Sequence, residues 1–177
     1  GPFVVVNCAN MEPDRVEAEL FGIEPPAGEG AEEGGRRVGM FEAAHTGTLL
    51  LDAVDDMPLE TQGKIVRVLQ EQMFERVGGS ARVEVDVRVV AATSADLADR
   101  MNAGEFREDL FYRLSVVPIE VPPLIQRRDD IPSLATHFMK RAAEASGQPP
   151  RLLGEDALAA MQAYEWPGNV RELRNVI

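Results

Sequence analysis

A carboxylate at the end of an apolar run is the first side chain of this sequence that could do chemistry. The stretch GTLLLDAVDDMP, residues 47–58, places Asp52 directly after three leucines. Such a run predicts a buried strand, and a carboxylate at its rim can hold a magnesium-bound water or simply be solvated. The next residue, Ala53, can neither accept a proton nor orient water. Asp55 and Asp56 could substitute in part for a second carboxylate, face water or cap the following helix.

The remaining reactive side chains predict no hydrolytic triad and no metal cluster. The histidines, His45 and His137, are isolated from each other, and Cys8 is the only cysteine. A single cysteine excludes an intramolecular disulfide, and the apolar run around Cys8 predicts a small buried residue rather than a nucleophile. A reducing cytosol fits this composition.

The composition is that of a globular chain rather than a disordered or membrane-spanning one. The 177 residues are 45% hydrophobic and 27% charged, which is enough for one main domain and a small additional unit. No run approaches the roughly 20 apolar residues that span a bilayer, so we expect a cytoplasmic protein with no membrane contact. The formal net charge of −12 argues against this segment gripping a phosphate backbone.

Strands and helices alternate along most of the sequence. Continuous β-branched runs predict strands buried on both faces, and apolar residues at helical spacing predict the helices between them. Residues 24–37 are rich in Gly and Glu without apolar periodicity, which predicts an exposed, mobile loop. We predict strands at 3–9, 47–54, 82–94 and 115–121, and helices at 14–22, 58–79, 96–104 and 106–114.

This alternation predicts an α/β fold, because right-handed crossovers between the strands build a parallel sheet. The ligand site of such a sheet lies at the carboxyl ends of its strands, where Asp52, Thr93 and Ser94 fall. The last part of the sequence is helical in pattern. We therefore divide the chain into an α/β core at 1–123 and a small helical lid at 124–177.

Several long motifs occur in a fixed order along nearly the whole chain: GPFVVVNCAN, ELFG, GTLLLD, DVRVVAATS, FREDLFYRL, VPPL, RRDDIP and WPGNVREL. In this order they resemble the AAA+ central domain of sigma-54-dependent transcriptional activators, also called bacterial enhancer-binding proteins. The resemblance implies a P-loop-type parallel sheet flanked by helices, a C-terminal helical lid, and ATP or ADP with Mg²⁺. It also implies a homo-oligomer formed through the AAA+ domain, sigma-54 RNA polymerase as a partner, DNA bound through a separate C-terminal domain, and a histidine kinase acting through a separate receiver domain.

The sequence departs from the family pattern at three motifs. The family's P-loop, G-x-x-x-x-G-K-[ST], would precede Gly1 and occurs nowhere in the chain, so we expect a core truncated at its N-terminus and a lid truncated at its C-terminus. The family's Walker B strand ends in Asp-Glu, whereas this chain has Asp52 followed by Ala53. The family's sigma-contacting motif GAFTGA corresponds to PPAGEGAEEGG at 25–35, which lacks the Phe and the Thr.

The resemblance also assigns roles to individual residues. Asp52 holds Mg²⁺ through the nucleotide. Thr93 and Ser94 occupy the sensor I position, usually Asn in the family, which reports on the γ-phosphate. The alternative role for these two residues is a hydroxyl that caps the following helix. Arg107 and Arg113 match the family's arginine fingers, which stabilise charge on a nucleotide held by the neighbouring subunit. Together with Asp52 they are the predicted catalytic residues. Their alternative is a pair of surface salt bridges with nearby acids. Six positions apart on one helix, the two arginines differ by about 120° in direction.

Arg171 in WPGNVREL matches the sensor II arginine, which couples the lid to the nucleotide phosphates. Asn169 could cap the helix that carries it, and Trp166 with Pro167 would fix the approach to that helix. The alternative is an exposed arginine on a first helical turn, a place that the helix dipole slightly disfavours for a cation.

Two functions follow from these residues. The first is a nucleotide-responsive AAA+ module of a bacterial two-component regulator of the sigma-54 interaction type, with a degenerate Walker B motif, that controls oligomerisation and transcription. The alternative is an active ATPase module that remodels sigma-54 RNA polymerase. The lack of Glu after Asp52 and the lack of the remodelling motif both favour the first.

Overall fold

A computed structural model describes residues 1–9, 12–25, 35–149 and 152–177. These residues form two compact units, Gly1–Pro118 and Ile119–Ile177, and each unit is described by itself. Most of the loop predicted at 24–37, with most of the stretch that corresponds to the family's sigma-contacting motif, lies outside the described residues.

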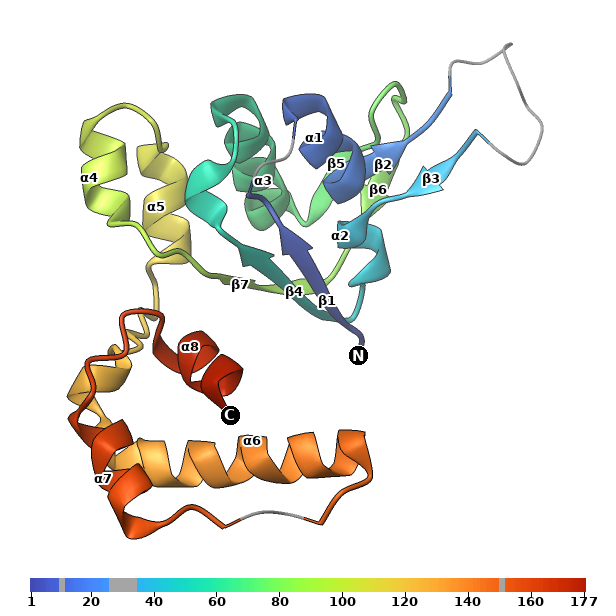
Figure 1. The fold of residues 1–177 in the computed structure, drawn as a ribbon. Helices are drawn as coiled ribbons and strands as arrows, with labels where there is room; N and C mark the ends of the chain where they lie inside the picture. The colour runs from blue at the N-terminus through green and yellow to red at the C-terminus, as the bar shows by residue number, and fades with distance from the viewer. Residues whose placement is uncertain (10–11, 26–34, 150–151) are drawn as a thin grey trace. The chain divides into compact units, whose positions relative to one another are not determined.

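Within the described residues, a three-stranded parallel sheet forms the centre of the first unit (Figure 1). Its strands are β1 (Phe3–Asn7), β4 (Gly47–Asp52) and β7 (Val87–Ala91), and β4 lies in the middle. Because both strand pairs are parallel, the carboxyl ends of all three strands meet at one edge. The predicted α/β fold with a parallel sheet is confirmed.

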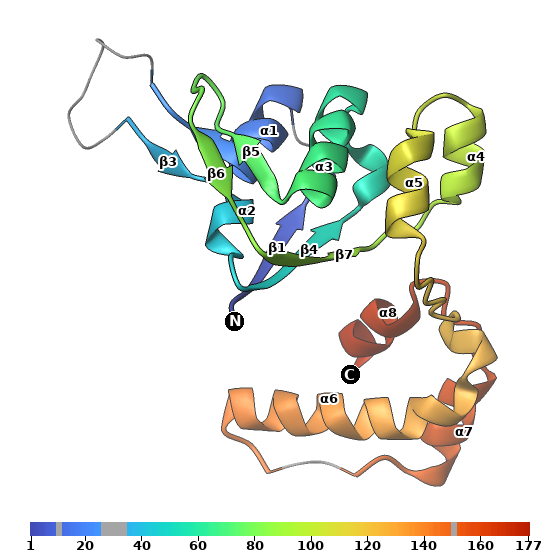
Figure 2. The ribbon, with the colours of Figure 1, turned by 180° about the vertical axis from the view of Figure 1, so that it is seen from behind.

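Three helices cover one face of this sheet (Figures 1 and 2), namely α1 (Pro13–Phe21), α2 (Met40–Ala43) and α3 (Leu59–Glu71). The short strands β2 (Gly22–Ile23) and β3 (Arg37–Val38) pair antiparallel after α1. The 3₁₀ turn η1 (Val54–Asp56) follows β4, and helices α4 (Leu97–Asn102) and α5 (Glu108–Leu114) follow β7. Helix α5 packs against both α4 and α3.

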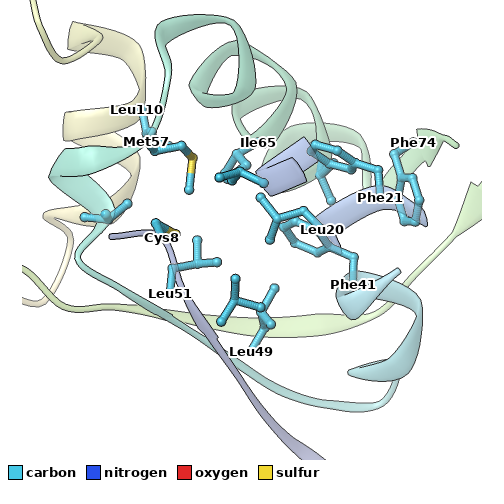
Figure 3. Packing of buried hydrophobic residues seen from close by; sticks show 14 of the residues in the cluster. Cys8, Leu20, Phe21, Phe41, Leu49, Leu51, Met57, Ile65, Phe74 and Leu110 are labelled. Atoms are coloured by element: carbon cyan, nitrogen blue, oxygen red, sulfur yellow. The ribbon is translucent and has the colours of Figure 1, made fainter. Parts of the chain in front are cut away.

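The core of the first unit lies between the sheet and these helices (Figure 3). Leu49 and Leu51 point from β4 toward Leu20 of α1 and Ile65 of α3, and all four side chains are fully buried. Leu49 and Leu51 lie two residues apart and therefore on one face of the strand, which is the face that the helices cover.

The predicted burial of the strands on both faces is wrong for the described part of the chain. Val6 of β1 is buried, but Phe3 and Val5 of the same strand are 66% and 53% exposed, and Val90 of β7 is 42% exposed. Within the first unit, helices α1, α2 and α3 cover one face of the sheet, so alternate residues of each strand are left on the other face.

The helix predicted at 58–79 is shorter in the structure. Helix α3 ends at Glu71, and Gln72 takes the left-handed conformation with φ 53° and ψ 32°. The chain then turns into strand β5 (Met73–Glu75), which places Phe74 in the core. This long-range burial outweighs the local helical pattern of the sequence.

The strand predicted at 82–94 divides into two. Its first part is β6 (Arg82–Glu84), which pairs antiparallel with β5, and its second part is β7 in the main sheet. The alternating pattern runs through this division without a break, and the continuous apolar residues begin only at Val89, inside β7.

The strand predicted at 115–121 is wrong, because the structure places no strand there. Val116, Val117 and Ile119 are 75%, 75% and 83% exposed. A strand needs a neighbour to take its backbone hydrogen bonds, and within the described residues β7 pairs with β4 alone.

A buried arginine ties the β5–β6 hairpin to the rest of the unit. Arg76 is 6% exposed and donates to Glu42 from Nη2 and Nε at 2.8 and 3.2 Å, and to Glu24 from Nη1 at 3.2 Å. We expect Arg76→Met to lower the free energy of unfolding by about 2 kcal/mol, less than the loss of a fully buried pair, because both carboxylates reach solvent. Urea unfolding measures this free energy. Arg82→Met, at an exposed arginine of β6, is the control, and an equal loss of stability in this variant would contradict the prediction.

The second unit is helical, as predicted. Its segments are the 3₁₀ turns η2 (Leu124–Gln126) and η3 (Arg128–Asp130) and the helices α6 (Ile131–Ser146), α7 (Glu155–Ala163) and α8 (Asn169–Val176). Leu124, Ile131, Trp166 and Leu173 form its core, and Trp166 donates from Nε1 to the carbonyl of Met161 at 2.6 Å. None of the helices in the described ranges combines the length and apolar character that a membrane crossing requires.

Candidate functional site

Asp52 ends the central strand, with Asn7 at the end of β1 as its neighbour across the sheet. Its Oδ1 accepts a hydrogen bond from the N–H of Ala53 at 3.1 Å, and Oδ2 accepts one from Asn7 Nδ2 at 3.5 Å. Asn7 Oδ1 also accepts from the N–H of Ala9 at 2.8 Å. These contacts hold a half-buried carboxylate at the carboxyl edge of the sheet.

Ala53 takes the left-handed backbone conformation, with φ 53° and ψ 51°. A non-glycine residue there carries strain of roughly 1–2 kcal/mol. The turn is held by the N–H of Val54, which donates to the carbonyl of Ala92 after β7 at 3.1 Å. The residue after Asp52 is therefore positioned by two neighbouring strand ends.

Thr93 bonds to Asp55, so the ends of β4 and β7 are joined by side chains as well. The hydroxyl of Thr93 donates to Asp55 Oδ1 at 2.6 Å and accepts from the N–H of Ala95 at 3.0 Å. The Asp55 side chain is only 8% exposed, and Arg100 of α4 reaches its Oδ2 at 3.9 Å. Asp55 is a structural link at this edge and does not face water.

Asp96 caps the helix that follows, so the capping alternative for Thr93 and Ser94 is wrong. Its Oδ1 accepts from the N–H groups of Ala98 and Asp99 at 2.8 and 3.3 Å. Ser94 is exposed, and its hydroxyl bonds to none of the residues that the structure describes. Of the two predicted side chains, Ser94 is the one whose hydroxyl is available to a ligand.

Arg107 precedes α5 and forms the surface salt bridge that was the alternative to an arginine finger. Its Nε and Nη2 donate to the two carboxylate oxygens of Asp109 at 3.0 and 2.7 Å. The guanidinium lies over Gly63 of α3, where an added Cβ would stand 3.6 Å from Nη1. Both charged side chains are over 40% exposed, so solvent screens the pair and Asp109 can be exchanged for another anion.

The Arg107 hydrogen bond holds the pKa of the Asp109 carboxyl below its ordinary value of 3.8. We expect Arg107→Ala to raise this pKa toward that value. Because the folded-state pKa is lowered, the stabilisation is present above the unfolded-state pKa and is lost as pH falls through the folded-state pKa. An NMR titration of the carboxyl carbon measures the shift, and an equal shift in Arg113→Ala would contradict the pairing.

Arg113 has a different partner from Arg107. With the amide of Gln70 turned so that its oxygen faces the guanidinium, Arg113 donates to it from Nη2 and Nε at 3.0 and 3.2 Å. The structure therefore attaches one arginine to Asp109 and the other to α3. The two guanidinium groups do not converge on one partner. The expected divergence on one helix does not apply, because Arg107 is the N-cap of α5 with an extended backbone and only Arg113 lies within the helix.

Arg171 lies exposed on the first turn of α8, in the second unit. The predicted cap of this helix is wrong, because Gly168 rather than Asn169 is the N-cap. Asn169 Oδ1 instead accepts from the N–H of Leu124 at 2.7 Å, and the N–H of Gly168 donates to Glu172 Oε2 at 2.8 Å. The asparagine joins α8 to the start of its own unit.

Two residues of this region were missed from the sequence. Asn7 ends an apolar run just as Asp52 does, and this shared signal could have found it. Gln62 is fully buried in α3 and bonds to backbone groups of Met57, Glu105 and Arg107, which lie in two segments outside the helix. No sequence signal distinguishes it, because a glutamine within a helical pattern is ordinarily a surface residue.

The donor set at this edge suits a magnesium nucleotide better than a bare metal ion. In the part of the chain that the structure describes, no group of three or more His, Cys, Asp or Glu could hold a metal. Asp52 offers one half-buried carboxylate, and Mg²⁺ commonly takes one or two carboxylates with water and phosphate oxygens. Burial first, and then the nearby aspartates, raise the pKa of the Cys8 thiol to about 12.

Comparison with protein families identifies two matching models. The Sigma-54 interaction domain matches residues 1–120, and the AAA+ ATPase lid domain matches residues 126–177. The nitrogen assimilation regulatory protein NtrX of Azorhizobium caulinodans is 53% identical over 175 residues, covering 99% of this chain and 37% of that protein. The DNA-binding transcriptional regulator NtrC of Escherichia coli is 49% identical, with the same coverage of 99% and 37%. The chain thus spans little more than a third of the length of these relatives.

A solved structure shares this fold. The crystal structure of NtrX from Brucella abortus in complex with ATP is 55% identical in sequence and matches with a TM-score of 0.88, covering 99% of this chain and 37% of that one. The same protein in complex with ADP matches with a TM-score of 0.87, at 55% identity and the same coverage.

Proposed function

This chain belongs to the family of sigma-54 interaction domains, with an AAA+ ATPase lid domain at residues 126–177, and from that premise we propose a nucleotide-responsive AAA+ module of a bacterial two-component transcriptional regulator. The module binds ATP or ADP with Mg²⁺ and uses the bound nucleotide to control oligomerisation and thereby transcription. Ala53, in the place of the family's Walker B Glu, keeps hydrolysis slight.

The observation that carries this proposal is that Asp52 and Thr93 lie at the carboxyl ends of the neighbouring parallel strands β4 and β7, at the edge where such sheets bind ligands. The complexes of the Brucella abortus NtrX with ATP and with ADP support a nucleotide as that ligand. Asp52 holds Mg²⁺ through water, and Ser94 beside Thr93 contacts phosphate oxygens. The bound nucleotide supplies the phosphate oxygens and the negative charge with which Ser94 and the Mg²⁺ held by Asp52 interact.

Basic residues complete the proposed site. Arg107 and Arg113 reach a nucleotide held by a neighbouring copy of the chain, one binding phosphate while the other organises the interface. Arg171 contacts the phosphates from the lid. We place the core at 1–123 and the lid at 124–177, a division supported by the two compact units and by the two family matches.

The partners of the whole protein are part of this proposal. The related regulators are about three times as long as this chain, which leaves room in them for further domains. We propose DNA binding through a separate C-terminal domain, phosphorylation of a separate receiver domain by a histidine kinase, and a cytoplasmic location. An active ATPase that remodels sigma-54 RNA polymerase is the second candidate, and the retention of Arg107, Arg113 and Arg171 favours it.

Titration of the full-length protein with a fluorescent ATP analogue tests the proposal. We expect Asp52→Asn to weaken binding about tenfold in Mg²⁺ and to have little effect in EDTA, because the carboxylate acts through the metal. Asp56→Asn, at an exposed acid four positions further on, is the matched control. Equal binding by the unchanged protein and Asp52→Asn in Mg²⁺ would refute the assignment of Asp52.

A further inference from the structure

A buried glutamine bridges two segments of the candidate site. Gln62 of α3 is 0% exposed. Its Nε2 donates to the carbonyls of Met57 at 2.7 Å and Glu105 at 3.2 Å, and its Oε1 accepts from the N–H of Arg107 at 2.8 Å. Both amide hydrogens and the amide oxygen are therefore used. A fully satisfied polar group in a dry interior is rigid and costly to disturb.

The two ends of this bridge carry Asp52 and Arg107. Met57 directly follows the 3₁₀ turn after Asp52, whereas Glu105 lies in the loop that leads into α5. Arg107 is the N-cap residue of α5, so the helix itself offers no partner to its backbone N–H. The side chain of Gln62 supplies that partner and thereby fixes the point from which the guanidinium extends.

A second series of contacts reaches the same loop from Thr93. Thr93 bonds to Asp55, Asp55 lies 3.9 Å from Arg100, and Arg100 pairs with the carboxylate of Glu105. Glu105 is thus held twice, through its side chain by Arg100 and through its carbonyl by Gln62. The loop before α5 is connected to both strand ends at the candidate nucleotide site.

We propose that Gln62 is a positioning residue for Arg107, which ties the backbone of Arg107 to the segment after Asp52. Nucleotide bound in one copy of the chain then sets the position of the guanidinium that this copy offers to the next. This inference rests on the proposed function, because it takes ATP as the ligand and Arg107 as the group that reaches a neighbour's nucleotide.

The test compares the unchanged full-length protein with Gln62→Met, Arg107→Ala and the double variant. Gln72→Met, at an exposed glutamine after α3, is the matched control. Two quantities are measured: the Kd for ATP in dilute protein, and the protein concentration at half-maximal ATP-driven assembly, by sedimentation. We expect Gln62→Met to raise the assembly concentration about tenfold while the Kd changes by less than about twofold.

The double variant separates positioning from general damage. We expect it to assemble no worse than Arg107→Ala, because both changes act through one guanidinium. If the losses of assembly in the two single variants add up in the double variant, or if Gln62→Met assembles normally, the inference is overturned while the proposed binding of nucleotide stands. Failure of the unchanged protein to bind ATP would instead overturn the proposed function, and this inference with it.

If Gln62→Met folds poorly, a second variant, Gln62→Glu, can test the bridge by hydrogen exchange in the absence of nucleotide. Gln62→Glu keeps the size of the side chain, and its neutral carboxyl can accept from Arg107 N–H and donate to one carbonyl. Both the neutral and the ionised carboxyl can accept from the Arg107 N–H, so we expect hydrogen exchange at the Arg107 amide in Gln62→Glu, corrected for intrinsic rates, to stay as slow as in the unchanged protein. Exchange at this amide that is much faster than in the unchanged protein, while the amides of α3 stay protected, would count against the bridge.

Discussion

Replacing Ala53 with Glu in the full-length protein is expected to raise the rate constant for ATP hydrolysis by about 10²–10⁴-fold, the usual contribution of a positioned general base. The affinity for ATP should change by less than about twofold, because the nucleotide is held by other groups. The backbone at position 53 is already left-handed, and Ala and Glu carry the same Cβ penalty there. The position is half-buried, so a carboxylate can remain hydrated.

Ala53→Gln is the matched control for this gain, because it has the size of Glu without its basicity. Turnover measured under single-turnover conditions separates the chemical step from product release. Equal rates for Ala53→Glu and Ala53→Gln would contradict the expected role of this position. If both bind ATP and neither hydrolyses it, the domain acts by binding alone and the regulatory function is the stronger candidate.

Phe41→Ala is expected to lower the free energy of unfolding by about 3–5 kcal/mol, through lost burial and the cavity that remains. Phe41 is 0% exposed. Its ring centroid lies 5.6 Å from that of Phe21 and 6.1 Å from that of Phe74 (Figure 3). The three rings join α1, α2 and β5, so one truncation weakens three contacts between elements.

Phe3→Ala is the control for this prediction, since it makes the same change at a ring that is 66% exposed. Urea unfolding followed by far-UV circular dichroism gives both values, and we expect Phe3→Ala to cost under about 1 kcal/mol. A loss at Phe3 as large as that at Phe41 would show that the exposed face of the sheet is covered in solution.

The sequence by itself determined the parallel sheet and the residues at its edge. Apolar runs alternating with helical patterns are local signals, and the carboxyl ends of parallel strands must lie together, so Asp52 and Thr93 could be placed at one edge before the structure was known. The ordered motifs identified the family for the same reason, since each motif is a short continuous stretch. The roles of these side chains toward a nucleotide stay predictions.

Only the tertiary structure decided how those residues are held. Asp55 bonds to Thr93 across 38 positions of sequence, and Gln62 bonds to Arg107 across 45. Hydrogen bonds over such separations leave no periodicity in the chain, and the choice of partner follows from burial. The same cause shortened α3, where burying Phe74 outweighed a helical pattern, and left 115–121 without a strand, since a strand forms only where another strand can take its hydrogen bonds.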